Sequence, residues 1–156
     1  MLYWRFSRND KEKNVDTVNT GLALPLAAMM TLTLMVWIYM FVQRVSYMSA
    51  NKVDAEELVT PADTQRLISA EASSAANNFK NLFEMPVIFY AVSLYLTVFG
   101  LVDSLHVTCA WIFVGLRVVH SAIHCSYNRV MHRFAVYLLA SLAVWVMVVR
   151  GLIAAL

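Results

Sequence analysis

The chain reads LHVTCAWIFVGLRVVHSAIHC from Leu105 to Cys125, an apolar run that is interrupted by Arg117, His120 and His124. A helix needs about 20 apolar residues to cross the hydrocarbon core of a bilayer, and this run is long enough. An ionisable side chain inside that core costs roughly 2.5–3.5 kcal/mol even on lenient insertion scales. Such residues are retained where they pair inside a protected cavity, so the stretch predicts a membrane helix with an internal polar site.

Three further segments of the 156-residue chain have the same apolar character: Gly21–Val42, Leu82–Val102 and Phe134–Leu156. A signal peptide is the competing interpretation of the first segment, but its apolar core would span only about 7–15 residues. The composition agrees with a membrane protein, because 60% of the residues are hydrophobic and 14% are charged, against roughly 25% charged in soluble proteins. We therefore predict an all-α, multi-pass integral membrane four-helix bundle. Residues 1–20 are expected to form an exposed N-terminal arm, and residues 21–156 the transmembrane domain.

Charge and cysteine usage exclude several other classes of protein. The formal net charge of +2 is too small to indicate a nucleic-acid-binding surface, and the chain contains no glycine-rich phosphate loop. Cys109 and Cys125 lie about 24 Å apart along one predicted helix, which is too far for a disulfide within one chain. Basic residues flank the apolar segments on both sides of the membrane, so the positive-inside rule leaves the orientation undecided.

The second helix is predicted to begin outside the membrane. Thr60 is suited to cap a helix, Pro61 to occupy its first position, and Asp63 to meet the positive end of the helix dipole. No helix-breaking residue follows before Pro86, so we predict one long helix from Pro61 to Val102.

Two connections and one small-residue stretch complete the predicted topology. Residues 46–59 are expected to form an acidic loop, and the tight turn at residues 100–104 makes the second and third helices antiparallel neighbours. The stretch Ser69–Ala76 is rich in small residues, which permit close packing of helices in membranes. It predicts that the second helix lies at the centre of a homo-oligomer.

Polar side chains gather on one face of the second helix and one face of the third, because they are spaced three or four residues apart. They are Asn77, Lys80, Asn81 and Glu84 on the second helix, and Arg117, His120, His124 and Asn128 along the third. Counting about 27 Å along each helix from the turn that joins them places Glu84 level with His124. Pro86 removes an amide just past Glu84 and loosens the helix there.

The balance of charge on these faces predicts an anionic ligand. Arg117, Arg129 and Arg133 accompany a single nearby carboxylate, that of Glu84, which leaves an excess of positive charge. A purely structural Glu–Arg clamp is the simpler alternative. The spacing of His120 and His124, with Glu84 as a third ligand, would also suit a metal. Arg117 would repel a cation, so no metal site is predicted.

The motif Asn81-Leu-Phe-Glu84-Met-Pro86, followed by Arg117-Val-Val-His120 and then by Arg129 and Arg133, resembles the MAPEG family. These are the membrane-associated proteins of eicosanoid and glutathione metabolism, among them the microsomal glutathione transferases. The resemblance covers Asn77 to the C-terminus by motif and the first helix by hydropathy. It implies a homotrimer of four-helix protomers that holds glutathione between neighbouring protomers.

The resemblance also implies roles for individual residues. Asn81 and Glu84 match the family's glutathione contacts, with Glu84 facing the amino group of the ligand. Arg133 matches the arginine that stabilises the thiolate and is the expected catalytic residue. The remaining expected glutathione contacts are Lys80, Arg117, His120, His124, Arg129 and, by a looser alignment, Arg44.

The function implied is a glutathione-dependent transferase or peroxidase that acts on a hydrophobic small molecule in the lipid bilayer. The chain departs from the eicosanoid enzymes at three positions, because Asn77 and Lys80 replace arginines and His124 replaces a tyrosine. Lysine lacks the planar fork that suits a carboxylate, so an altered anionic ligand is an alternative. The other alternative is a non-catalytic membrane subunit or lipid-binding protein with the same fold.

Overall fold

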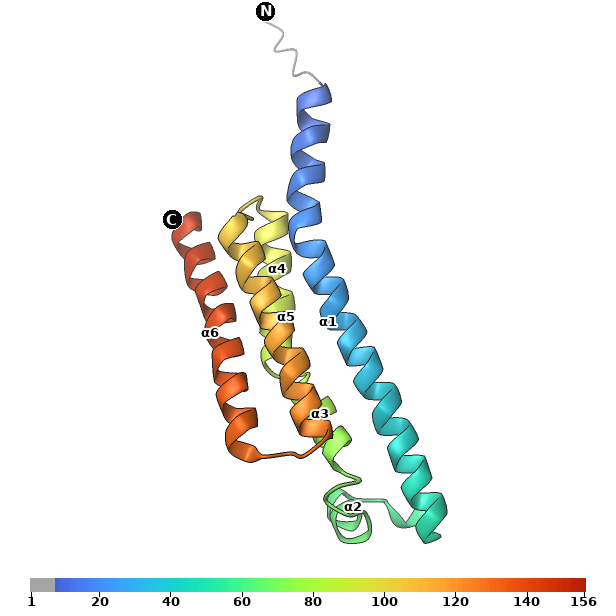
Figure 1. Cartoon of the computed structure of the whole chain (residues 1–156). Helices are drawn as coiled ribbons and strands as arrows, with labels where there is room; N and C mark the ends of the chain where they lie inside the picture. The colour runs from blue at the N-terminus through green and yellow to red at the C-terminus, as the bar shows by residue number, and fades with distance from the viewer. Residues whose placement is uncertain (1–7) are drawn as a thin grey trace, which may run out of the picture.

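The computed structural model describes the backbone of residues 8–156 and the side chains of residues 21–156 (Figure 1). Over this range the chain is helical and contains no strand. The elements are α1 (Arg8–Asn51), a 3₁₀ turn (Ala55–Glu57), α2 (Pro61–Leu67), α3 (Ser74–Asn81), α4 (Met85–Val98), α5 (Ser104–Cys125) and α6 (Val130–Ala155).

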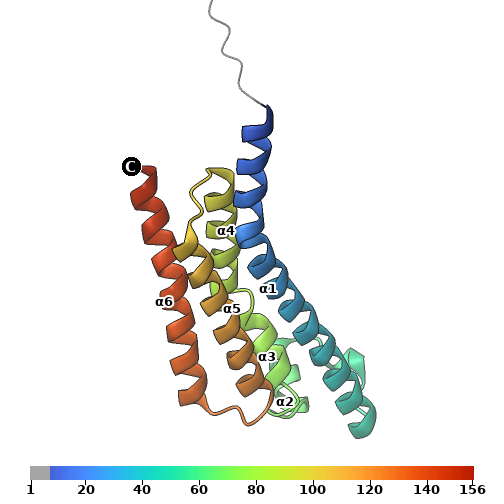
Figure 2. The ribbon, with the colours of Figure 1, turned by 45° about the horizontal axis from the view of Figure 1, so that its top comes forward.

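Four helical stretches of the described chain are long and apolar enough to cross a membrane. They are Gly21–Asn51, Ser74–Val98, Ser104–Cys125 and Val130–Ala155. The long helices run side by side, and α5 packs against α1, α3 and α6 (Figures 1 and 2). This arrangement confirms the predicted all-α integral membrane four-helix bundle.

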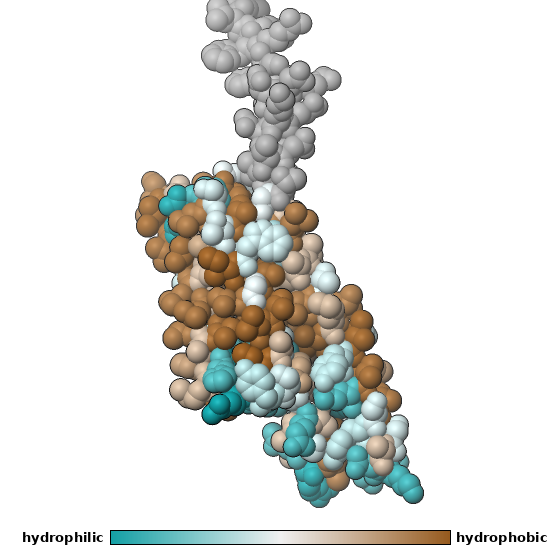
Figure 3. Space-filling model, in the orientation of Figure 1, coloured by the Kyte–Doolittle hydropathy of each residue, from teal (hydrophilic) through white to brown (hydrophobic). Residues whose placement is uncertain are grey.

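Large apolar side chains fill the centre of the bundle. The rings of Phe89 on α4 and Phe113 on α5 are both fully buried, with centroids 4.6 Å apart. Met29 on α1 and Met147 on α6 are also fully buried in this core. Figure 3 shows hydrophobic residues over the flank of the bundle, whereas hydrophilic residues gather at the end where α2 lies. That surface is the one expected of a protein whose flanks face lipid.

The start of α2 confirms the predicted helix cap. The Thr60 hydroxyl oxygen accepts a hydrogen bond from the Asp63 amide at 3.2 Å, and the Asp63 carboxylate accepts one from the Thr60 amide at 3.2 Å. The hydrogen bond from the Thr60 side chain lowers the pKa of the Asp63 carboxyl below its usual value. Such a reciprocal pair satisfies two of the amides that a helix start leaves free.

The single long second helix was a wrong prediction, because the structure divides it into α2, α3 and α4. The first break follows Leu67, where Ile68 takes an extended conformation and its side chain is buried. The second break lies at residues 82–84. Pro86 accounts for this break in two ways. Its ring collides with the carbonyl group of Leu82, four residues earlier, and its backbone nitrogen has no hydrogen to donate to that carbonyl.

The ends of α1 also differ from the sequence expectation. The helix continues to Asn51, so the loop expected at residues 46–59 is confined to the residues after it and to the 3₁₀ turn. At the other end, the backbone is helical from Arg8. Residues 8–20 of the predicted arm therefore extend α1, and residues 1–7 lie outside the described range.

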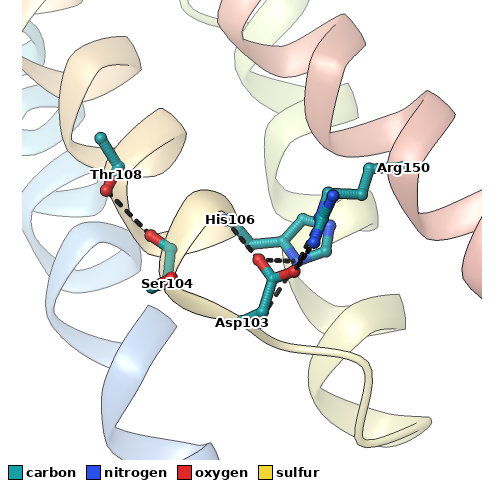
Figure 4. A network of polar contacts seen from close by, with 5 residues as sticks. All are labelled: Asp103, Ser104, His106, Thr108 and Arg150. Carbon is teal, nitrogen blue, oxygen red and sulfur yellow. Dashed lines mark hydrogen bonds and ion pairs between the residues drawn. The ribbon is translucent and has the colours of Figure 1, made fainter.

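A polar cluster closes the bundle at the turn between α4 and α5 (Figure 4). Asp103 caps α5, and its carboxylate accepts a hydrogen bond from the His106 amide at 2.9 Å. The Nε of Arg150 on α6 donates to the same carboxylate at 2.6 Å. The His106 amide, together with Arg150, holds the pKa of the Asp103 carboxyl below its usual value. The cluster ties the α4–α5 turn to α6.

Candidate functional site

The short helix α3 lies against the last two turns of α5. Asn78 is fully buried, its amide nitrogen donates to the Cys125 sulfur at 3.4 Å, and its oxygen accepts from the Ser121 hydroxyl at 3.3 Å. Asn78, rather than Glu84, therefore lies level with the end of α5. Counting residues from the turn misplaced Glu84 because α4 ends at Val98, so residues 99–102 were wrongly counted as helix.

Arg117 is the most unusual side chain of the bundle. It is fully buried, and its Nη2 donates to the Asn81 carbonyl oxygen at 3.1 Å. Its Nε and Nη1 atoms have no hydrogen-bond partner among the described residues, and neither does the buried Oδ1 of Asn81 or Nδ1 of His120. A buried charge without partners costs several kcal/mol or more. The site thus offers donors for an acceptor that the described residues do not provide.

Arg133, in the first turn of α6, is held by two neighbours. Its Nη1 donates to the Asn128 side-chain oxygen at 2.5 Å and lies 3.0 Å from Nε2 of His124. The same Nη1 lies 3.4 Å from Nδ1 of that ring, so the guanidinium lies over the face of the His124 imidazole. Asn128 has a φ of 50°, a left-handed conformation that asparagine tolerates, and so directs its side chain back toward Arg133.

A cavity of 340 Å³ lies beside Arg133, between α3, α4, α5 and α6. Its lining comprises Asn81, Glu84, His120, Val130, Arg133, Phe134 and Tyr137. The His120 ring lies across that of His124 at 5.7 Å and faces Tyr137 at 6.1 Å between centroids. Sequence reasoning missed Tyr137, although its place one helical turn after Arg133 was a usable signal.

Two charged candidates of this region behave differently from expectation. Glu84 is exposed, and no cation of the described residues lies within salt-bridge distance of its carboxylate. The structural Glu–Arg clamp is therefore not formed by Glu84 within the described chain, and a partner in a neighbouring chain is a prediction. Arg129 precedes α6 as its N-terminal cap residue, is exposed, and does not line the cavity.

Arg44, Asn77 and Lys80 do not join this site within one chain. They line a second cavity, of 300 Å³, between the end of α1, α2 and α3. The residues that the sequence assigned to one site are thus not brought together: some line the first cavity, some the second, and Arg117, His124 and Arg129 line neither. No group of three or more histidine, cysteine or acidic side chains in the described chain could hold a metal ion.

The fold and these cavities define a class of protein: a small multi-pass membrane bundle that keeps cationic and amide side chains at a boundary of its apolar core. The chain belongs to the MAPEG family, whose family model matches residues 22–153 of the 156. No curated protein and no solved structure matches it. The family match confirms the resemblance carried by the motifs and makes the chain a membrane protein of eicosanoid and glutathione metabolism.

Proposed function

We propose that the protein is a glutathione-dependent transferase or peroxidase that acts on lipophilic electrophiles in the membrane. The observation that carries the proposal is the buried Arg117, whose Nε and Nη1 atoms have no partner among the described residues and whose Nη2 bonds to Asn81, a residue of the 340 Å³ cavity that Arg133 also lines. Two guanidinium groups with unused hydrogen-bond donors favour a ligand with carboxylate and thiolate groups. Glutathione carries both, and the family match supports it.

Arg133 supplies the chemical step in this proposal. A free thiol with a pKa near 8.5 needs a shift of about two units, or ~2.7 kcal/mol, to be mostly thiolate at neutral pH. One charge-assisted hydrogen bond supplies roughly 1.5–3 kcal/mol. Arginine suits this role because it does not give up its own proton. The thiol proton passes to solvent, and the thiolate sulfur then attacks a substrate that arrives from the lipid. An electrophilic carbon expels its leaving group, whereas a hydroperoxide oxygen breaks its O–O bond and leaves glutathione sulfenic acid and an alcohol.

The exposure of Glu84 supports a site that a second copy of the chain completes. Glu84 shares the cavity with Arg133 yet lies open to the outside at the start of α4. We therefore propose a homotrimer with glutathione between neighbouring protomers. Native mass spectrometry in mild detergent is expected to record three copies. A protein that remains a monomer across detergents would contradict it.

Replacing Glu84 with glutamine is expected to weaken glutathione binding by about tenfold or more, because a charge-assisted contact with the ligand's amino group is worth roughly 1.5–3 kcal/mol. Isothermal calorimetry on the detergent-purified protein measures the change. Since Glu84 is exposed and has no ionic partner in its described chain, the thermal unfolding midpoint should not fall. Unchanged binding together with a lower midpoint would assign Glu84 to structure instead.

The replacement of family arginines by Asn77 and Lys80 favours a second candidate, a non-catalytic membrane subunit or lipid-binding protein with the same fold. The two candidates differ in turnover. An enzyme consumes glutathione in the presence of lipid hydroperoxides or chlorinated aromatic electrophiles. A wild-type protein that binds lipid but turns over none of these would favour the second candidate.

A further inference from the structure

Asn128 lies in the connection of residues 126–129 between α5 and α6, and its backbone is closely constrained. Its amide donates to the Ile123 carbonyl oxygen at 2.9 Å and so closes the end of α5. Its φ of 50° is a left-handed conformation that only one other non-glycine residue of the described chain, Lys52, adopts. Asparagine tolerates this conformation better than most residues do. The direction of the Asn128 side chain is therefore set by the way in which α5 ends.

That side chain holds Arg133, in the first turn of α6. Its Oδ1 atom accepts a hydrogen bond from Nη1 of Arg133, and the ring of His124, in the last turn of α5, lies against the same nitrogen. Arg133 is only half-buried, and a long cationic side chain at the start of a membrane helix is otherwise free to extend to the headgroups. The Asn128 contact selects one orientation of the guanidinium, beside the 340 Å³ cavity that Arg133 lines.

The acceptor that Asn128 provides is neutral, which preserves the positive charge of Arg133. No carboxylate of the described residues forms an ion pair with Arg133. A carboxylate at position 128 would also hold the guanidinium, but its negative charge would disfavour a thiolate nearby. An amide oxygen orients the guanidinium without adding that repulsion.

We propose that Asn128 is a positioning residue for the thiol chemistry of Arg133. Asn128 does not line the cavity, and it acts only through the guanidinium that it holds. A guanidinium that is oriented before the ligand arrives loses less rotamer freedom when it binds the thiolate. The inference rests on the proposed glutathione chemistry and adds to it a residue outside the family motif.

The matched substitutions Asn128→Gly and Lys52→Gly test the proposal in the full chain in detergent. Glycine adopts a positive φ without strain, so both changes keep the backbone and remove only a side chain. Lys52 is exposed and lines neither cavity. Asn128→Gly should lower kcat about tenfold or more, since a misplacement of about 1 Å costs up to roughly 100-fold. The KM for glutathione should change little, and Lys52→Gly should leave both constants unchanged. Equal kcat values for the two variants would overturn the proposal.

Two further measurements separate positioning from a general loss of structure. The ultraviolet absorbance of bound glutathione thiolate should appear about one pH unit higher in Asn128→Gly than in the wild type, which is a tenfold change in ionisation. Nuclear magnetic resonance of arginine-labelled protein should show an ordered Arg133 side chain in the wild type and in Lys52→Gly, and a mobile one in Asn128→Gly. The signal that Arg133→Lys removes is that of Arg133. An Arg133 side chain that stays ordered in Asn128→Gly would contradict the inference.

Asn128→Asp tests the importance of a neutral acceptor. Aspartate also tolerates a positive φ and places an oxygen at the same point, so the Arg133 side chain should stay ordered. The thiolate should nevertheless form at a higher pH than in the wild type, because the new carboxylate repels it. Ionisation at the wild-type pH would show that the charge of the acceptor has no effect and would overturn this part of the proposal.

The double variant Asn128→Gly/Arg133→Lys shows whether Asn128 acts through Arg133. Lysine has no planar fork to be oriented, so adding Asn128→Gly to Arg133→Lys should lower turnover by less than about twofold. A loss as large as that in the wild-type background would give Asn128 an independent role and overturn the proposal. A wild type without glutathione turnover would reject the enzyme and the positioning role together. Turnover that Asn128→Gly retains in full would reject the positioning role alone.

Discussion

Replacing Arg133 with lysine is expected to lower glutathione-dependent turnover by about 100-fold, since removing one donor to a developing anion costs roughly 10²–10³ in rate. One terminal nitrogen of Arg133 is already engaged by Asn128 and His124, which leaves the rest of the planar fork for the sulfur. Lysine concentrates its donors on one nitrogen and cannot satisfy both neighbours and the thiolate in that geometry. Glutathione affinity should change little, because Asn81, Glu84 and Arg117 are left in place.

The measurement is steady-state turnover paired with calorimetric binding on the same preparation. Arg66→Lys is the matched control, because Arg66 is an exposed residue of α2 that contacts only Asp63 among the described acidic residues. If Arg133→Lys keeps wild-type turnover, Arg133 serves to anchor α6 at the headgroups. Either cation performs that task equally well.

Replacing Arg117 with methionine is expected to weaken glutathione binding by about 100-fold, in line with the 2–5 kcal/mol that truncating one partner of a buried charge pair costs. Stability should stay level or rise. Arg117 is fully buried, yet its guanidinium has one hydrogen bond and two free nitrogens among the described residues. A buried charge in that state opposes folding, and an apolar side chain of similar length removes the penalty.

Arg150→Met gives the reciprocal result and is the control. Arg150 pairs with Asp103 at the opposite end of the bundle, so its loss should lower the thermal unfolding midpoint and leave glutathione binding unchanged. Thermal unfolding in detergent and calorimetry report the two quantities for both variants. A lower midpoint for Arg117→Met with unaltered binding would make Arg117 a structural clamp and remove the main support for an anionic ligand.

The sequence by itself determined the membrane class, the four spans and the family motif. Each is a local property: a span depends on the hydropathy of consecutive residues, as in the predicted segment Gly21–Val42, which lies within the helical stretch Gly21–Asn51. The reciprocal cap of Thr60 and Asp63 was predictable for the same reason, because its two partners are three residues apart. The surplus of cationic side chains could also be counted without a structure.

Only the tertiary structure decided how those residues are grouped. No proline or glycine beside Leu67 indicates from the sequence that the helix breaks there. Ile68 leaves the helix and is buried, and that burial depends on packing that the local sequence does not encode. The contact of Asn78 with Cys125 joins residues 47 positions apart, as does the pair of Asp103 with Arg150.

The division of the candidate residues between two cavities follows from the same limit. Lys80 and Asn81 are neighbours in the chain, yet Lys80 lines the cavity against α1 and Asn81 the one against α6. Helical periodicity assigns each of them to its own face of α3, because consecutive helical residues point about 100° apart. Packing between segments far apart in sequence decides which helix each face meets. That packing places Arg44 and Arg133 in different cavities.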